Sequence, residues 1–336
     1  MTDYILAGDL GATKTNIALF ESSNLQAGPQ FTESYLNAEH DGLHAIVRKY
    51  LGDKSINIRT ACFGVAGPVI DNHVRMINLD WEVDGAELCA EFGWQSAWLI
   101  NDLKALANAV PFLQPAEMHT FQAGVPEQGG SIAVIAPGTG LGIGYLTWAG
   151  GRYTAYATEG GHASFAPETD LQHELLQWLR PQFGQVAIEH VCAGVGFPNL
   201  YGFLKASGHA SEPEWLAREL AAEGDDNNAI IVKHALEQTP GSEICQMTLK
   251  LFVEILGATS GNLALGMGAT GGVYVGGGIP PRILPALQRY DFMKFFLGKV
   301  GYEEYLSRFP VHMILQPTAA LLGAAAYARQ QAGSPS

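Results

Sequence analysis

Two stretches of the sequence share one organisation, in which a short apolar strand meets a turn of small residues and a second strand follows. The first is "YILAGDLGATKTNIALF", and the second is "SIAVIAPGTGLGIGYLTW", which begins at Ser131. Glycine suits such turns because it lets the backbone bend tightly and approach a neighbour closely. A supersecondary unit that occurs twice indicates a duplicated structure. We therefore expect two α/β domains with a cleft between them, which the length of 336 residues also favours.

The first turn differs from a Walker A phosphate loop. That loop has the pattern G-x-x-x-x-G-K-[ST] between a strand and a helix, and the N–H groups at the helix start bind phosphate. Here Thr13 stands before Lys14, where the loop needs glycine, and "NIALFE" alternates as a strand does. The second turn, "GTGLGIG", fails the dinucleotide pattern G-x-G-x-x-G. Both are predicted as hairpin turns whose N–H groups form a concave site for phosphate.

Composition limits the possible partners and the cell compartment. The net charge of -14 argues against binding to nucleic acid or an anionic membrane, which requires clustered Lys and Arg, but it permits a nucleotide. We expect reduced, buried thiols without zinc or disulfides, because no C-x-x-C pair occurs among Cys62, Cys89, Cys192 and Cys245. The first residues lack a signal-peptide pattern and no stretch approaches a membrane span, so a cytoplasmic location is predicted.

Further elements are predicted from apolar periodicity and from glycine and proline positions. A helix over "DGAELCAEFG" is expected to end at Gly93, and a strand over "SAWLIND" precedes a helix over "LKALANAVPFL". "VRMINLDWEV" is predicted as an extended excursion, and residues 114–130 as a polar connection. The second half is predicted to hold helical residues 169–184, a long helix over 242–268, a buried strand before a triple glycine, and a final strand and Ala-rich helix.

Polar side chains at two places are candidates for a binding site. Asn101 and Asp102 stand where a strand stops, so their side chains are expected to point beyond the sheet. The alternative for both is an N-cap of the following helix. "TEGGH" holds Glu159 and His162 around two glycines, which suits close approach to a small polar ligand, and "AIEHV" adds Glu189. Carboxylates and neutral imidazole pair well with hydroxyl groups, although lone Glu and His residues are also common as solvated or structural groups.

Seven segments in order resemble the bacterial glucokinase family, in its non-ROK group, within the actin, sugar kinase and Hsp70 superfamily. They are "GDLGATKTNIALFE", "VAGPV", "INDLKALANAV", "PGTGLGIG", "EGGH", "IEHVCAG" and "GGGIPP". The resemblance covers essentially the whole chain. It implies a duplicated, ribonuclease H-like fold of two lobes, each with a mixed five-stranded sheet and helices, and ATP in the central cleft. We expect a small α/β domain at 1–112 plus 317–336 and a large α/β domain at 113–316.

The resemblance assigns ATP binding to both turns and to the triple glycine. The matching positions are Asp9, Gly11, Ala12, Thr13, Lys14, Asn16, Gly138, Thr139, Gly140, Gly142, Gly276, Gly277 and Gly278. The family more often has glycine in place of Ala12, and close relatives often have Asn in place of Lys14. Ala12 therefore needs backbone torsions that a Cβ accepts, and Lys14 is expected to contact phosphate.

The resemblance also implies the roles of the polar residues. Asp102 is the implied general base, and the implied contacts of the glucose hydroxyls are Asn101, Asp102, Glu159, His162 and Glu189. Phosphoryl transfer needs a cation on the phosphates, and we predict that Asp9 holds Mg²⁺ through water. The alternative for Asp9 is a carboxylate that stabilises the turn. We predict no zinc, because the cysteine-rich motif of ROK kinases is absent after His162.

The implied activity is ATP-dependent phosphorylation of glucose at the 6-hydroxyl, which gives glucose 6-phosphate and ADP in the first step of glycolysis. A homodimer is the implied assembly. Mannose, fructose or glucosamine is an alternative substrate on the same fold. A non-catalytic, sugar-sensing regulator is a second alternative; such ROK relatives carry an N-terminal helix-turn-helix, whereas "YILAGDLG" begins at residue 4. A filament or chaperone of the superfamily would need large insertions that this length does not accommodate.

Overall fold

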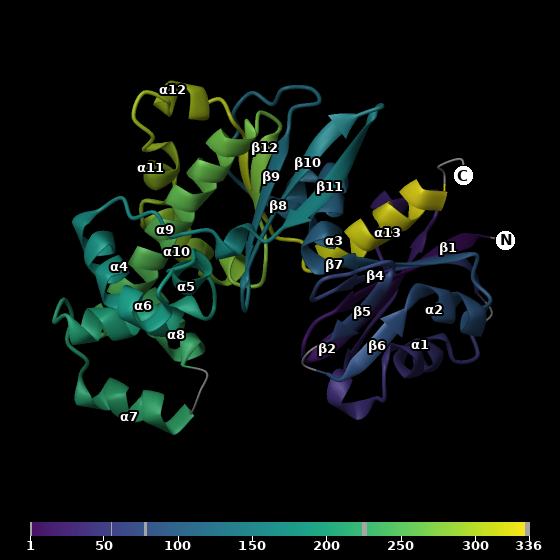
Figure 1. Cartoon of the computed structure of the whole chain (residues 1–336), viewed down its shortest axis with the longest axis horizontal. Coiled ribbons are helices and arrows are strands. Elements are labelled where there is room, and N and C mark those ends of the chain that lie inside the picture. The colour runs from purple at the N-terminus through teal and green to yellow at the C-terminus, as the bar shows by residue number, and fades with distance from the viewer. Residues whose placement is uncertain (1, 55, 77–78, 224–226, 333–336) are drawn as a thin grey trace. The chain divides into compact units, whose positions relative to one another are not determined.

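The computed structural model describes residues 2–54, 56–76, 79–223 and 227–332 (Figure 1). Contacts divide the chain into two units. Unit 1 consists of Met1–Met118, Leu146–Ala157 and Gln316–Ser336, and unit 2 consists of His119–Tyr145 and Thr158–Leu315. Among the described residues, no helix is both long and apolar enough to cross a membrane.

Unit 1 is built on a five-stranded mixed sheet. Its order is β3 (Gln30–Leu36), β2 (Lys14–Glu21), β1 (Asp3–Leu10), β4 (Asn57–Val65) and β7 (Ser96–Asn101). The β1–β2 and β2–β3 pairs are antiparallel, whereas β1–β4 and β4–β7 are parallel. The predicted hairpin and the predicted five strands are therefore confirmed for this unit.

Helices cover both faces of this sheet. In Figure 1, α3 (Asp102–Ala109) and α13 (Ala319–Ala332) lie on one side, and α1 (Leu43–Leu51) and α2 (Gly85–Phe92) lie on the other. The α2 helix starts because the side chain of Asp84 accepts hydrogen bonds from two N–H groups of its first turn, and it ends at Gly93 in the left-handed conformation. The predicted helix end at Gly93 is thus confirmed.

One segment of unit 1 is more regular than predicted. The segment predicted as an extended excursion contains β5 (His73–Met76) and β6 (Trp81–Asp84), which pair antiparallel. Residues 77–78 of that segment lie outside the described residues. Val74, Met76, Trp81 and Val83 turn their side chains into the core, which gives this small sheet a buried face.

The second sheet has six strands. Its order is β11 (Arg152–Thr158), β10 (Leu141–Ala149), β9 (Ile132–Pro137), β12 (Gly272–Val275), β13 (Val311–Ile314) and β8 (Met118–Gln122). The first five repeat the strand order of unit 1, with β12 parallel to both β9 and β13. The sixth strand, β8, was predicted as part of a polar connection, because its residues are only partly buried and show no apolar alternation.

The helices of unit 2 gather around one long central helix, α9 (Glu243–Met267). It contacts α6 (Gly196–Ala206), α8 (Asn228–Glu237) and α11 (Phe292–Leu297). A Cβ at Gly257 or Gly261 would lie 2.3 or 2.4 Å from a carbonyl oxygen of α11, so only glycine permits this close packing. The predicted helices over 169–184 and 242–268 correspond to α4 (Asp170–Phe183) and α9.

The remaining helices differ in length. The α-helices are α4 (Asp170–Phe183), α5 (Glu189–Cys192), α7 (Glu214–Glu223), α10 (Leu284–Arg289) and α12 (Glu303–Leu306). The 3-10 helices are η1 (Leu25–Ala27), η2 (Asn37–Glu39), η3 (Val110–Phe112), η4 (Pro115–Glu117), η5 (Gly160–His162) and η6 (Pro280–Ile283). All four cysteines are free thiols, and three are buried as predicted, whereas Cys89 is half-buried.

Candidate active site

The first glycine turn joins β1 to β2 and is held by a residue that sequence reasoning missed. Asn37 donates from its backbone N–H to Thr13 O at 2.9 Å and from Nδ2 to Gly11 O at 2.9 Å. Its Oδ1 accepts from the hydroxyl of Thr15 at 2.8 Å. Ala12, Thr13 and Lys14 remain exposed. Asn37 thus braces the turn from behind and leaves its outer side open to a ligand.

The substitution of Ala12 for the glycine of the family is compatible with this turn. Ala12 is not among the described residues with positive φ, and in that case a Cβ causes no backbone strain. The expected requirement on the torsions of Ala12 is therefore met.

Asp9 lies just before the turn and is partly shielded from water. It faces Asn16 across the β1–β2 pair, and Asn16 Nδ2 donates to its Oδ2 at 3.4 Å. Burial raises the pKa of Asp9, and the charge of Asp102 raises it further, while the bond from Asn16 and the charge of Lys14 lower it. Asp9 also lies near Asp102, because Asp9 pairs with Gly64 across β1 and β4, and a Cβ at Gly64 would lie 3.7 Å from Asp102 Cα.

Strand register explains this proximity. Leu10 pairs with Val65 across β1 and β4, and Val65 pairs with Asn101 across β4 and β7, so the three strands end in one row. Asn101 caps α3, because its Oδ1 accepts from the N–H groups of Leu103 at 3.0 Å and Lys104 at 3.2 Å. The N-cap alternative therefore applies to Asn101, which also donates to Gly67 O at 3.4 Å.

Asp102 is the first residue of α3, and its position depends on a glycine in the neighbouring strand. Its Oδ1 accepts from the N–H of Leu103 at 2.8 Å. A Cβ at Gly64 would lie 2.9 Å from Ala105 Cβ and 3.7 Å from Asp102 Cα, so glycine in β4 lets α3 approach the sheet. Sequence reasoning did not single out Gly64. The only signal was its place among small residues at the end of a buried strand.

The second glycine turn, between β9 and β10, is held by a carboxylate. Glu189 at the start of α5 accepts the N–H of Leu141 through Oε2 at 2.7 Å. A Cβ at Gly140 would lie 2.5 Å from that oxygen, which explains glycine at this position. Glu189, predicted to bind sugar, therefore also fixes the backbone of the turn.

Glu159 and His162 are mainly exposed, with side-chain accessibilities of 85% and 62%, and Glu159 Oε2 lies 3.8 Å from His162 Nε2. The two glycines between them pack on the start of β10. A Cβ at Gly161 would lie 2.2 Å from Leu141 O, and one at Gly160 would lie 3.0 Å from Ile143 Cγ2. The backbone of this segment therefore lies against β10, the strand that follows the second turn.

The triple glycine also approaches the second turn. Gly276 N–H donates to Ile135 O at 2.8 Å. Gly277 has φ +84°, and a Cβ there would lie 2.4 Å from Pro137 O, so a larger residue would be excluded by torsion and by space. Pro137 directly precedes Gly138, so the second turn and the triple glycine are neighbours in unit 2.

Each unit therefore brings together part of the predicted set. The unit 1 group contains Asp9, Asn16, Asn101 and Asp102 beside the first turn. The unit 2 group contains Glu159, His162 and Glu189 beside the second turn and the triple glycine. Among the described residues, no three His, Cys, Asp or Glu side chains form a metal-binding cluster.

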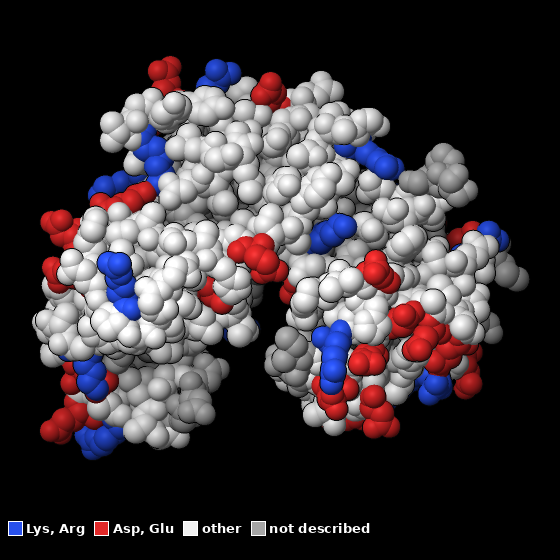
Figure 2. Space-filling view, in the orientation of Figure 1, with Lys and Arg blue, Asp and Glu red and all other residues white. Residues whose placement is uncertain are grey.

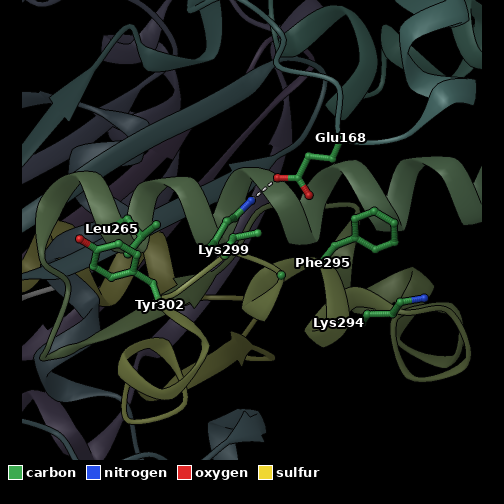
Figure 3. Close-up of a pocket in the computed structure, with 8 residues that line it drawn as sticks. Glu168, Leu265, Lys294, Phe295, Lys299 and Tyr302 are labelled. Carbon is green, nitrogen blue, oxygen red and sulfur yellow. Dashed lines mark hydrogen bonds and ion pairs between the residues drawn. The ribbon is translucent and has the colours of Figure 1, made fainter.

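A separate hollow of about 590 Å³ in unit 2 holds none of these residues (Figure 3). Its lining includes Leu265 of α9 and Lys294 and Phe295 of α11. Inside it, the buried Lys299 forms an ion pair with Glu168, and Figure 3 shows the two side chains meeting in front of α9. This pair ties the loop before α4 to the segment after α11, which is a structural role.

Comparison with known proteins identifies the family. The glucokinase family model matches residues 6–331. A glucokinase of Nostoc punctiforme is 36% identical over 334 residues, which cover 96% of this chain and 97% of that protein. The crystal structure of a glucokinase from an Antarctic psychrotroph is 31% identical with a TM-score of 0.83, and the alignment covers 98% of this chain and 100% of that one.

A more distant structure shares the fold. It is a ROK family glucokinase from Streptomyces griseus in complex with glucose and AMPPNP, with 19% identity, a TM-score of 0.64, and coverage of 97% of this chain and 99% of that one. The match of the family model over nearly the whole chain and the identity to curated glucokinases agree with the two glycine turns and their polar neighbours. The chain therefore belongs to the glucokinase family, and its activity is the phosphorylation of glucose.

Proposed function

We propose that the phosphoryl donor is ATP with Mg²⁺ and that the acceptor is the 6-hydroxyl of glucose. The products are glucose 6-phosphate and ADP, and the reaction is the first step of glycolysis. The glucose and AMPPNP bound to the Streptomyces griseus enzyme support this choice of ligands. The observation that carries the proposal is the repeated unit: each sheet contains two consecutive strands joined by a glycine turn, and each turn has the polar residues of one group beside it.

Asp102 is the proposed general base. A base in this chemistry orients the attacking hydroxyl and takes its proton late, because the transition state is loose. The bond from Leu103 N–H to Oδ1 fixes the orientation of the carboxylate before any ligand binds. The other side chains that we assign to the sugar hydroxyls are those of Asn101, Glu159, His162 and Glu189.

Both glycine turns are assigned to the ATP phosphates, through Gly11, Ala12, Thr13, Lys14 and Asn16 in unit 1 and Gly138, Thr139, Gly140 and Gly142 in unit 2. Backbone N–H groups bind phosphate without net charge, which suits this acidic chain. Gly276, Gly277 and Gly278 are assigned to the adenosine, where missing side chains leave room for a flat base.

Asp9 is the proposed partner of Mg²⁺, through water. Its carboxylate supplies the hard oxygen that Mg²⁺ prefers, and its raised pKa is the mark of a carboxylate with little compensating charge around it. When bound, Mg²⁺ neutralises charge on the phosphates. Asn16 Nδ2 keeps the side chain of Asp9 oriented by its bond to Oδ2.

Further assignments complete the proposal. We assign the chain to the non-ROK group, without a zinc site, and we place the protein in the cytoplasm as a homodimer. Domain boundaries at 112/113 and 316/317 are proposed for the small and large α/β domains, with hinges at 111–130 and near Pro317. Closure about these hinges would protect ATP from hydrolysis.

An ADP-release assay with glucose, mannose, fructose and glucosamine tests the proposal. We expect ADP release to require both glucose and Mg²⁺ and to give the highest kcat/KM with glucose. A higher kcat/KM with another hexose would assign the pocket to that sugar instead. A structure with glucose bound would check the five sugar contacts, and a sugar bound away from Asp102 would contradict the assignment of the base.

A further inference from the structure

A cavity of about 330 Å³ lies in unit 1, apart from every residue assigned to the reaction. Its walls come from three segments: the end of α3 with η3, the last turns of α13, and the tip of the β10–β11 hairpin. All three segments belong to the same compact unit. The volume lies in the range of pockets that hold small molecules.

The charge of this cavity differs from that of the protein. The chain has 33 acidic and 19 basic residues, and Asp and Glu gather over α1, α2 and β6 on the face drawn in Figure 2. In contrast, the residues that line the cavity include Arg152 and Arg329 and neither Asp nor Glu. Arg329 forms no ion pair with a described carboxylate, and a guanidinium so placed favours an anion.

The side chain of Arg329 packs on an aromatic ring in the wall of the cavity. Its guanidinium lies over the ring of Phe112, 5.2 Å from the centroid. Burial lowers the pKa of Arg329, and no carboxylate of the described residues offsets this cost. An anion in the cavity would supply the missing charge and accept two parallel N–H bonds from the guanidinium.

The other walls are aromatic. Trp148 is 45% exposed although it is a large apolar residue. It meets Tyr153 edge to face, with ring centroids 4.8 Å apart. Asn108 donates from Nδ2 to Lys104 O at 2.7 Å, which leaves its Oδ1 able to accept from a hydroxyl. Flat rings next to arginine suit a ligand that joins an anionic group to a compact apolar or ring-shaped body.

We propose that this cavity is a second ligand site, which binds a small organic anion with a phosphate or carboxylate group on a ring-shaped body. The arginines hold the anionic group, and Trp148, Tyr153 and Phe112 hold the ring. The site does not depend on the assignment of Asp102 or of the glycine turns, because it shares no residue with them.

Calorimetric titration of the full chain at low ionic strength tests this site. The probes are phenyl phosphate, benzoate, inorganic phosphate and phenol. We expect one of the two ring-bearing anions to bind at least about tenfold more tightly than inorganic phosphate or phenol, because each of these lacks one half of the recognised structure. A stronger signal from phenyl phosphate would identify a phosphate ester as the ligand class, and a stronger signal from benzoate would identify a carboxylate. Binding of neither ring-bearing anion would overturn the proposal.

Variants locate the binding. Arg329→Gln and, at the exposed hairpin tip, Arg152→Gln should each weaken the ring-bearing anion about tenfold or more. Trp148→Ala should weaken it while leaving inorganic phosphate unchanged. Arg218→Gln, at an exposed position on α7 of unit 2, is the matched control and should bind as the parent does. Unchanged affinity in both arginine variants, with the far-ultraviolet circular dichroism of the parent, would place the anion elsewhere and overturn the site.

Discussion

The unit 1 group and the unit 2 group stand beside equivalent turns but are held differently. In unit 1, Asn37 braces the first turn, whereas the carboxylate of Asp9 accepts from Asn16 and that of Asp102 accepts from the N–H of Leu103. In unit 2, Glu189 itself holds the turn, while Glu159 and His162 extend into solvent. In unit 1, therefore, the residue that holds the turn differs from the residues that we propose for the reaction, whereas in unit 2 Glu189 holds the turn and is also a proposed contact of the sugar. Substitutions should show this difference.

Asp102→Asn is expected to have the largest effect. The amide keeps an oxygen for the Leu103 N–H but cannot take the proton, so kcat should fall by roughly 10²- to 10⁴-fold while glucose binding changes little. Steady-state kinetics and a glucose titration measure this. Asp170→Asn is the matched control, because Asp170 is also the first residue of a helix behind an N-cap. A loss of less than about tenfold in kcat would remove Asp102 from the role of base.

The carboxylates of the unit 2 group should differ from one another. Glu189→Ala leaves the N–H of Leu141 without its acceptor, so glucose KM should rise by about fivefold to a hundredfold and the Tm should fall. Glu159→Ala and His162→Ala should raise KM over a similar range without lowering the Tm, because both side chains are mainly exposed. Glu189→Gln keeps an acceptor and should restore the Tm. A parental Tm in Glu189→Ala would show that the bond does not hold the turn.

Asp9 should make stability depend on pH. Its raised folded-state pKa means that the native protein keeps this proton to a higher pH than the unfolded chain. The contribution of Asp9 to stability therefore falls as the pH rises from the unfolded pKa through the folded pKa. Asp9→Asn should have a higher Tm than the parent at pH 7, and the difference should shrink toward the acidic carboxyl range. A lower Tm at pH 7 would mean that the charge is compensated; thermal melts from pH 4 to 8 decide this.

Lys14→Asn should have the smallest effect. Lys14 is exposed at the rim of the first turn, where water and salt screen its charge. We expect a rise of no more than about threefold in the KM for ATP, which disappears at high salt. A larger, salt-independent rise would show direct and desolvated contact with phosphate.

The sequence predicted the parts of this structure that depend on local pattern. Both hairpins, the long helix and the helix end at Gly93 follow from periodicity and glycine positions. The parts that it did not predict depend on distant contacts. β8 is partly buried and becomes a strand only by pairing at the sheet edge, and Asn37 acts on a turn more than twenty residues away. Likewise, no local pattern could show that Glu189 serves the turn at Leu141.

The packing of α13 has a consequence for synthesis of the chain. This helix contacts β1, β4 and α3, and a Cβ at Gly323 would lie 1.7 Å from Ala105 O, so the two helices touch through their backbones. On the ribosome, β1 and β4 emerge before all of unit 2, whereas α13 emerges after it. Domains commonly fold as the chain is made. Here all five strands of the first sheet emerge early, whereas α13, which packs on this sheet, emerges last. The apolar surface that α13 covers therefore needs protection while unit 2 is translated.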